Sequence, residues 1–177
     1  ITKQYGLEFK HTENLFVEFD REPLMPFMVS QEGPALATGD INNDGLDDIF
    51  IGSVKWEKSA VFIQQPTGKF VKTIQPALNK DSTYEDVDAI WADFNNDGFT
   101  DLAVASGGNE YYGASEFLLP RLYLNDGKGN LTKKEGTFTN MMMTASCIVA
   151  HDFNGDGEKD LFIGGRVSKK FPWPPQS

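Results

Sequence analysis

The sequence has a single cysteine, which excludes a disulfide framework within the chain. Cys147 lies in the apolar run 147–150, so we expect a small buried hydrophobic residue there. With 177 residues, of which 40% are hydrophobic and 12% aromatic, the chain can still bury a core. If anything besides the core fastens this fold, we expect it to be a bound metal ion.

Positive charge is also scarce, because 26 acidic residues face 16 basic ones and the formal net charge is -10. This balance argues against a protein that gains its affinity by neutralising phosphates, so nucleic acid and anionic lipid are not expected partners. No apolar run approaches the roughly 18 residues of a membrane-spanning helix. We therefore expect no transmembrane segment in this chain.

The sequence does contain an acidic motif that occurs three times. The segments are DINNDGLDD from Asp40, DFNNDGFTD from Asp93 and DFNGDGEKD from Asp152, and each has the form D-x-N-x-D-G-x-x-D. The first aspartates are 53 and 59 residues apart, which is the length of one supersecondary unit. The chain is therefore predicted to be built from repeats.

Short apolar runs precede and follow every acidic segment, as in 35–38 and 49–52 of the first repeat. Runs of this length, rich in Ile, Val, Leu and Phe and bounded by Gly and Asp, favour strands over helices. A second internal match, VFIQQPTGKFVK from Val61 with LYLNDGKGNLTK from Leu122, predicts another hairpin. Each complete repeat then has four antiparallel strands, which is typical of a β-propeller blade. The predicted class is all-β, a propeller fragment of about three blades, the last incomplete.

The predicted blades occupy residues 34–80, 81–140 and 141–177. The third ends after its second strand, so we expect the remainder of a longer propeller chain to complete it. Residues 1–33 have no acidic loop, but Leu7–Phe9 and Leu15–Phe19 are predicted as strands that could close a blade.

The acidic loops carry oxygen atoms in the pattern that a hard cation requires. Side-chain oxygens at loop positions 1, 3, 5 and 9, the carbonyl of position 7 and a water supply about six ligands, which suits calcium better than magnesium. Glycine at position 6 permits the positive φ that wraps the chain around an ion. We therefore predict up to three Ca²⁺ ions, one per loop. The predicted ligands are Asp40, Asn42, Asp44, Leu46 and Asp48; Asp93, Asn95, Asp97, Phe99 and Asp101; and Asp152, Asn154, Asp156, Glu158 and Asp160.

An EF-hand shares loop positions 1, 3, 5 and 6 with this motif, but it needs a bidentate Glu at position 12. The present loops have Ile51, Val104 and Ile163 there, which are predicted core residues of the following strand. A β-hairpin loop is therefore the better interpretation.

The acidic motif, followed by I/L-x-I/V-G and joined by LYLNDGKGNL, resembles the FG-GAP and VCBS repeats of integrin α-subunit propellers and their bacterial relatives. FIGGRV from Phe162 and GPALATGD from Gly33 resemble more particularly bacterial proteins of the ASPIC and UnbV-associated type. The resemblance covers about residues 33 to 167. It implies a propeller of about seven blades, exported to the cell surface or beyond, with calcium in a structural role.

Antiparallel strands place the acidic loops at one end of each blade and a candidate ligand face at the other. Aromatic side chains beside polar groups could stack on a sugar or anchor a protein there, although the tyrosines could equally pack between blades. The candidates for this face are Tyr84, Glu110, Tyr111, Tyr112 and Glu116.

Three functions are compatible with these patterns. The first is a non-enzymatic, calcium-stabilised extracellular module for adhesion or for binding protein or glycan. The second is the propeller of a polysaccharide-degrading enzyme, for which only Glu85, Glu110 and Glu116 offer an acid and a base on the ligand face. In the third, this segment is purely structural within a longer parent. We expect the first, with no catalytic residues.

Overall fold

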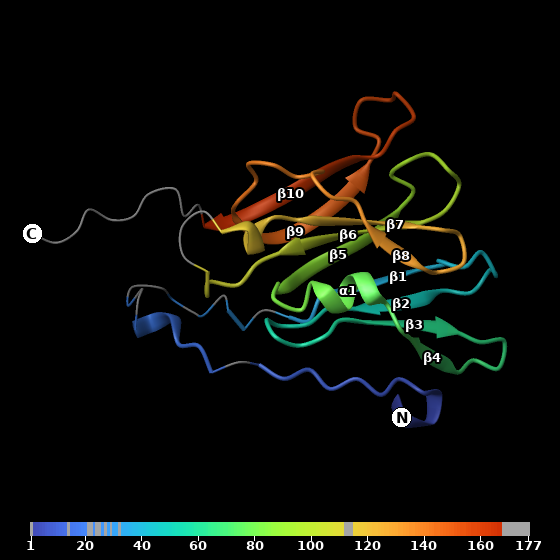
Figure 1. The fold of residues 1–177 in the computed structure, drawn as a ribbon, viewed down its shortest axis with the longest axis horizontal. Coiled ribbons are helices and arrows are strands. Elements are labelled where there is room, and N and C mark those ends of the chain that lie inside the picture. The colour runs from blue at the N-terminus through green and yellow to red at the C-terminus, as the bar shows by residue number, and fades with distance from the viewer. Residues whose placement is uncertain are drawn as a thin grey trace, which may run out of the picture.

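The computed structural model describes residues 2–13, 15–20, 23, 26, 28, 30, 31, 33–111 and 115–167. They form two four-stranded antiparallel sheets and a two-stranded third sheet, stacked in chain order (Figure 1). This confirms the predicted all-β class and the propeller fragment with an incomplete last blade.

Each sheet follows the chain order of its strands, so neighbouring strands are joined by hairpins. The first sheet consists of β1 (Leu36–Gly39), β2 (Asp48–Ile51), β3 (Ala60–Gln64) and β4 (Phe70–Thr73). The second consists of β5 (Asp86–Ala92), β6 (Asp101–Ser106), β7 (Arg121–Asn125) and β8 (Leu131–Lys133). The third pairs β9 (Thr144–His151) with β10 (Asp160–Val167).

The first and second sheets share one apolar core. Phe50 lies opposite Val61 in the strand register, so both side chains point to the same face, toward the second sheet. The rings of Phe50 and Trp91 meet edge to face, with their centroids 6.4 Å apart. The other face of the second sheet continues the stack, where Ala103 and Leu122 pack with Ile148 of β9. The second sheet therefore uses one face for each of its two neighbours.

The predicted N-terminal strands are wrong. Leu7–Phe9 and Leu15–Phe19 form no strand, and the described part of this region contains two short 3-10 helices, Thr2–Tyr5 and Glu18–Asp20. Gly6 packs so closely on Phe70 that an added Cβ would lie 2.2 Å from the Phe70 carbonyl oxygen. The segment therefore approaches the first sheet at β4 without joining its hydrogen-bond ladder.

Two further short helical segments were not predicted. The helix α1 (Pro76–Lys80) connects the first two sheets and contacts β8, and a 3-10 helix spans Glu116–Leu118. Pro76 stands at the start of α1, where its missing N–H costs no hydrogen bond. Among the described residues, no helix is long and apolar enough to cross a membrane.

Candidate metal centre

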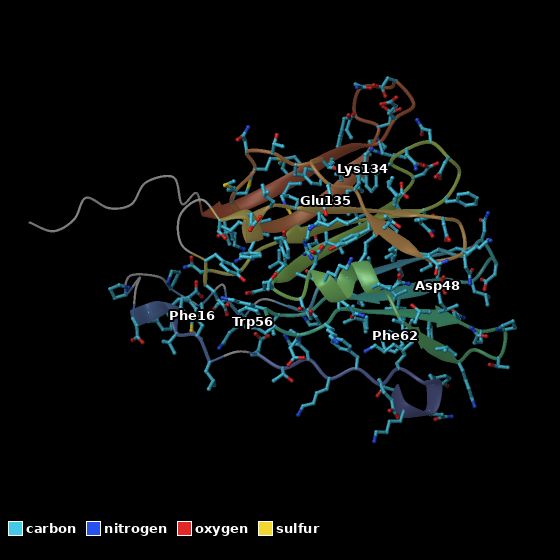
Figure 2. All side chains as sticks on the ribbon, viewed as in Figure 1. Phe16, Asp48, Trp56, Phe62, Lys134 and Glu135 are labelled. Carbon is cyan, nitrogen blue, oxygen red and sulfur yellow. The ribbon has the colours of Figure 1, made fainter. Side chains whose placement is uncertain are left out.

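The three acidic segments form the tips of the β1–β2, β5–β6 and β9–β10 hairpins, as predicted. We name them the first tip (40–48), the second tip (93–101) and the third tip (152–160). All three project from the same end of the stack (Figure 1). Asp48 marks this end in Figure 2, whereas Trp56 lies toward the opposite end.

Side-chain oxygens hold the first tip in shape by accepting backbone N–H groups. The Asp40 carboxylate accepts from the amides of Asp44 and Gly45, at 3.1 and 2.8 Å. Asn42 Oδ1 also accepts from the Asp44 amide at 3.1 Å, and Asp44 Oδ1 accepts from the Leu46 amide at 2.9 Å. The oxygen-bearing side chains at positions 1, 3 and 5 therefore belong to one local network.

The second and third tips repeat these hydrogen bonds position by position. Each loop also turns through positive φ at position 6, where Gly45, Gly98 and Gly157 have φ of 83°, 87° and 89°. Glycine adopts this conformation without steric cost. The shared motif therefore produces one loop conformation three times.

The position-9 carboxylate is the most enclosed group of the first two tips. Asp48 is fully buried and accepts from the Ile41 amide at 3.1 Å and from the Gln64 amide of β3 at 2.8 Å. Asp101 is likewise buried and accepts from Phe94 and Asn125. Burial raises the pKa of both carboxyls, against these hydrogen bonds, and the aspartates at positions 1 and 5 raise it further. A cation at the tip would relieve this repulsion.

The third tip holds its position-9 carboxylate less firmly. Asp160 accepts from the Phe153 amide at 3.1 Å and is only half-buried. In the first two tips a second N–H comes from the third strand of the same sheet. The third sheet has two strands in the described part of the chain, so Asp160 has no such donor there.

The donor set of each tip fits a hard cation in its chemistry, since all five predicted ligands of a tip offer oxygen atoms. Nevertheless, no group of three or more His, Cys, Asp or Glu side chains among the described residues is arranged to hold a metal ion. The carboxylates at positions 1 and 5 are turned toward N–H groups of their own loop instead. Ion binding would therefore require these side chains to reorient.

Sequence reasoning missed a polar residue between the first two tips. Asn125, at the end of β7, donates from Nδ2 to the carbonyl oxygens of Ile41 at 2.7 Å and Thr100 at 2.9 Å. The only signal was its place in the segment NDGKG, which predicts a turn but gives no indication of contact with another repeat.

The candidate ligand-face residues lie near the opposite end of the sheets and mostly pack against neighbours. Tyr84 is 9% exposed, and its ring meets Phe117 and the Arg121 guanidinium. The Tyr111 hydroxyl donates to the Thr83 carbonyl, and its ring also lies against Phe117. These contacts favour the interpretation in which the tyrosines pack.

The predicted carboxylates of this face do not share one environment. Glu110 is ion-paired with Lys55 at 3.2 Å, and Glu116 is exposed. Glu85 is 2% exposed, and burial followed by the charges of Glu110, Glu13, Asp86 and Glu18 raises its pKa to about 9. Tyr112 lies outside the described residues.

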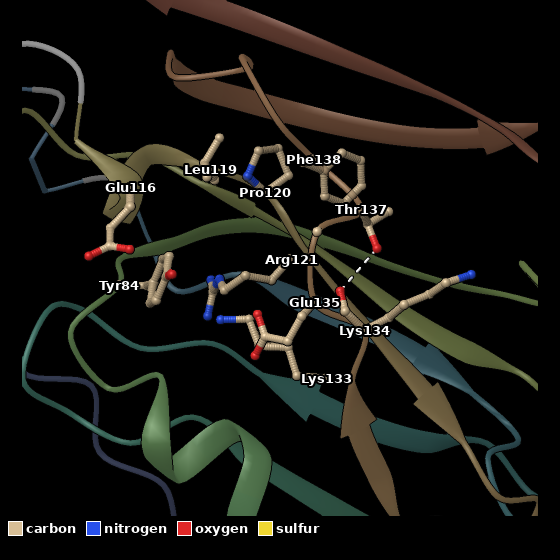
Figure 3. A pocket seen from close by; sticks show the side chains of 11 residues that line it. Tyr84, Glu116, Leu119, Pro120, Arg121, Lys133, Lys134, Glu135, Thr137 and Phe138 are labelled. Atoms are coloured by element: carbon tan, nitrogen blue, oxygen red, sulfur yellow. Dashed lines mark hydrogen bonds between the residues drawn. The ribbon is translucent and has the colours of Figure 1, made fainter.

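Two of these candidates, Tyr84 and Glu116, line a small cavity of about 110 Å³ (Figure 3). Phe138 and the basic side chains of Arg121 and Lys133 also line it. Both cations already have acidic partners, since Arg121 pairs with Asp86 and Lys133 with Asp81.

Comparison with known proteins identifies the repeats. The family model of the FG-GAP-like repeat matches residues 40–104 and 93–163, so the two matches together include all three tips. None of the curated proteins searched matches the chain. The matched residues begin at the first aspartate of the first tip and extend through the third tip into β10. On this evidence, the chain is a structural repeat module that belongs to the FG-GAP-like repeat family.

Proposed function

We propose that each acidic tip binds one calcium ion and that the chain acts as a calcium-stabilised, non-enzymatic scaffold module. The observation that supports this most is the set of hydrogen bonds shared by three loops whose donor set consists of hard oxygens. A structural accident would not be expected to keep the same acidic side chains in the same positions three times.

The ligands in each tip would be the side chains at positions 1, 3, 5 and 9 and the carbonyl at position 7. A bound cation supplies the positive charge that offsets repulsion among the carboxylates. Two carboxylates about 4 Å apart repel by roughly 4 kcal/mol at an effective dielectric constant near 20. An ion that binds only the folded chain at a hundredfold excess over its Kd stabilises it by about 2.7 kcal/mol per site.

Calorimetric titration with CaCl2, combined with thermal melting, tests this proposal. We expect three ions per chain, a rise in Tm with calcium, and a much smaller rise with MgCl2, which prefers tight octahedral sites. The triple variant Asp44→Ala/Asp97→Ala/Asp156→Ala should lose the heat of binding. Asp47→Ala is a matched control, because Asp47 is exposed and lies at position 8. A wild-type chain that gives no heat and no shift in millimolar calcium would refute the proposal.

We place this module at the cell surface or outside the cell, where millimolar calcium suits loops of modest affinity. Its role there would be adhesion or the binding of a protein or glycan. An activity screen on acidic polysaccharides tests the non-enzymatic part of the proposal. We expect no release of reducing ends, and release that copurifies with the chain and is lost in Glu116→Gln would contradict it.

A further inference from the structure

The turn between β7 and β8 (126–130) lies between the first and second tips. A Cβ added at Gly127 would lie 2.4 Å from the Phe99 ring, and one added at Gly129 would lie 3.5 Å from Ile41 Cδ1. Phe99 belongs to the second tip and Ile41 to the first. The backbone of this turn is therefore in contact with both tips.

Asn125 leads into the turn and is held there by hydrogen bonds from both polar atoms of its side chain and from its backbone amide. Its Oδ1 accepts from the amides of Gly127 and Gly129, at 3.2 and 3.1 Å. Its own amide donates to Asp101 Oδ1 at 2.8 Å. The Nδ2 group donates to Ile41 and Thr100, as described above. The residue is 4% exposed, so water does not compete strongly for these bonds.

The two carbonyls that Asn125 joins lie directly beside predicted ligands. Ile41 stands between Asp40 and Asn42, and its amide donates to Asp48. Thr100 stands between Phe99 and Asp101 in the second tip. A continuous hydrogen-bonded path therefore connects the position-9 carboxylates of the two tips through one side-chain amide.

We propose that Asn125 is a positioning residue that couples the first two tips, so that a cation bound at one raises the affinity of the other. This inference rests on the proposed calcium binding. Ordering one loop fixes the carbonyl that Asn125 bonds, which lowers the conformational entropy that the second loop must still lose. Such coupling commonly amounts to about 5-fold or more in affinity. No group of the third tip bonds to Asn125 in the part of the chain that the structure describes, so this tip binds independently.

The first sheet supplies a matched control at the equivalent residue, Gln64. Its backbone amide donates to the position-9 aspartate of its own repeat, as that of Asn125 does. In the described part of the chain, however, the Gln64 side chain makes no hydrogen bond to a tip. Gln64→Glu therefore adds the same charge as Asn125→Asp without removing a bridge between repeats.

The test is a calorimetric cycle in chains that carry Asp156→Ala, so that only the first two tips bind. Adding Asp44→Ala leaves the second tip alone, and adding Asp97→Ala leaves the first alone. We expect the product of the two stepwise calcium constants to exceed the product of the two single-tip constants about 5-fold. Asn125→Asp keeps the acceptor for the turn but removes the Nδ2 donor, and should bring this ratio to one. Gln64→Glu should leave it unchanged.

Amide hydrogen exchange provides a second readout that does not depend on measured affinities. With calcium bound at the second tip of the Asp44→Ala/Asp156→Ala chain, exchange at residues 40–48 should slow, and the Asn125→Asp chain should not show this effect. A ratio of one or below in the wild-type background, or a ratio that survives in Asn125→Asp, overturns the coupling while leaving calcium binding intact. An absence of binding at every tip would instead refute the proposed function.

Discussion

At the residue scale, Asp86, at the start of β5, is a buried carboxylate with three hydrogen-bond donors. Its carboxylate accepts from Arg121, from the Ser59 hydroxyl and from the Ser53 amide. Both Asp86 and Arg121 are 3% exposed. The bond from Ser53 ties the first sheet to the second, so this ion pair contributes to the position of one blade relative to the other.

Replacing Arg121 with Leu should destabilise the fold by about 3–5 kcal/mol, because it leaves the buried Asp86 charge without its cation. Urea denaturation of the variant and wild type measures the difference. Lys134→Leu is the control, because Lys134 is exposed and its loss should change stability by less than about 0.5 kcal/mol. Equal midpoints for Arg121→Leu and wild type would show that the pair contributes nothing.

Glu85 gives the fold a pH dependence of defined sign. Its pKa is raised from 4.5 to about 9, so the folded chain holds a proton that the unfolded chain has already released. The contribution of Glu85 to stability is therefore fully present below pH 4.5 and is lost as the pH rises toward 9. Relative to Glu85→Gln, which cannot ionise, wild type should lose up to about 1.4 kcal/mol per pH unit in this window.

Unfolding free energies of wild type and Glu85→Gln at several pH values between 5 and 9 would measure this effect. The difference between them should widen with pH in favour of the variant. The exposed residue in Glu116→Gln serves as the comparison and should give a flat difference. A flat difference for Glu85→Gln too would mean that Glu85 is ionised in the folded chain.

At the element scale, the three hairpin tips differ in how their last carboxylate is supported. A second backbone N–H reaches Asp48 and Asp101 from β3 and β7, whereas Asp160 accepts from Phe153 alone among the described residues. A ligand held in place before binding loses less entropy when the ion arrives. The third tip should therefore be the weakest of the three.

We expect its calcium Kd to be about tenfold higher, which corresponds to 1.4 kcal/mol. In a titration of the whole chain, Asp156→Ala should remove the weakest step and leave the tighter steps unchanged. Asp97→Ala should instead remove a tight step. If Asp156→Ala removed the tightest step, the N–H from the third strand would not be what sets the affinity.

The hairpins themselves could be predicted from sequence because their signals are local. The motif around Asp40 determines its own turn, and the apolar runs beside it have the length and composition of strands. The prediction of the N-terminal strands failed because its outcome depends on contacts that are not local. Leu7–Phe9 has suitable composition, but a strand also needs a partner for its N–H and C=O groups, and composition does not reveal whether one exists. The contact of Asn125 with Ile41 could not be predicted for the same reason, because the two residues are 84 positions apart in the sequence.

At the scale of the whole molecule, equivalent residues have different surroundings depending on their sheet. Phe50 and Phe162 both stand two residues after the last aspartate of their tip. Phe50 is fully buried between the first and second sheets, whereas Phe162 is 58% exposed on the outer face of the third. The repeat pattern of the sequence predicts the same burial for these two phenylalanines.

Phe50→Ala should therefore cost about 3–5 kcal/mol, as for a large side chain removed from a packed core. Phe162→Ala should cost less than about 1 kcal/mol. Chemical denaturation of both variants in the same buffer measures the two costs. Similar costs would indicate that the face around Phe162 is covered in solution, and sedimentation of the wild-type chain would then show a larger species.

The stacking of the sheets has a mechanical consequence. One core joins the first sheet to the second, and a separate core joins the second to the third. Pulling the chain from its two ends would load these cores in series, so rupture should occur in discrete events, with the two-stranded third sheet yielding first. Such a chain would behave as an extensible tether whose length increases in steps of one repeat.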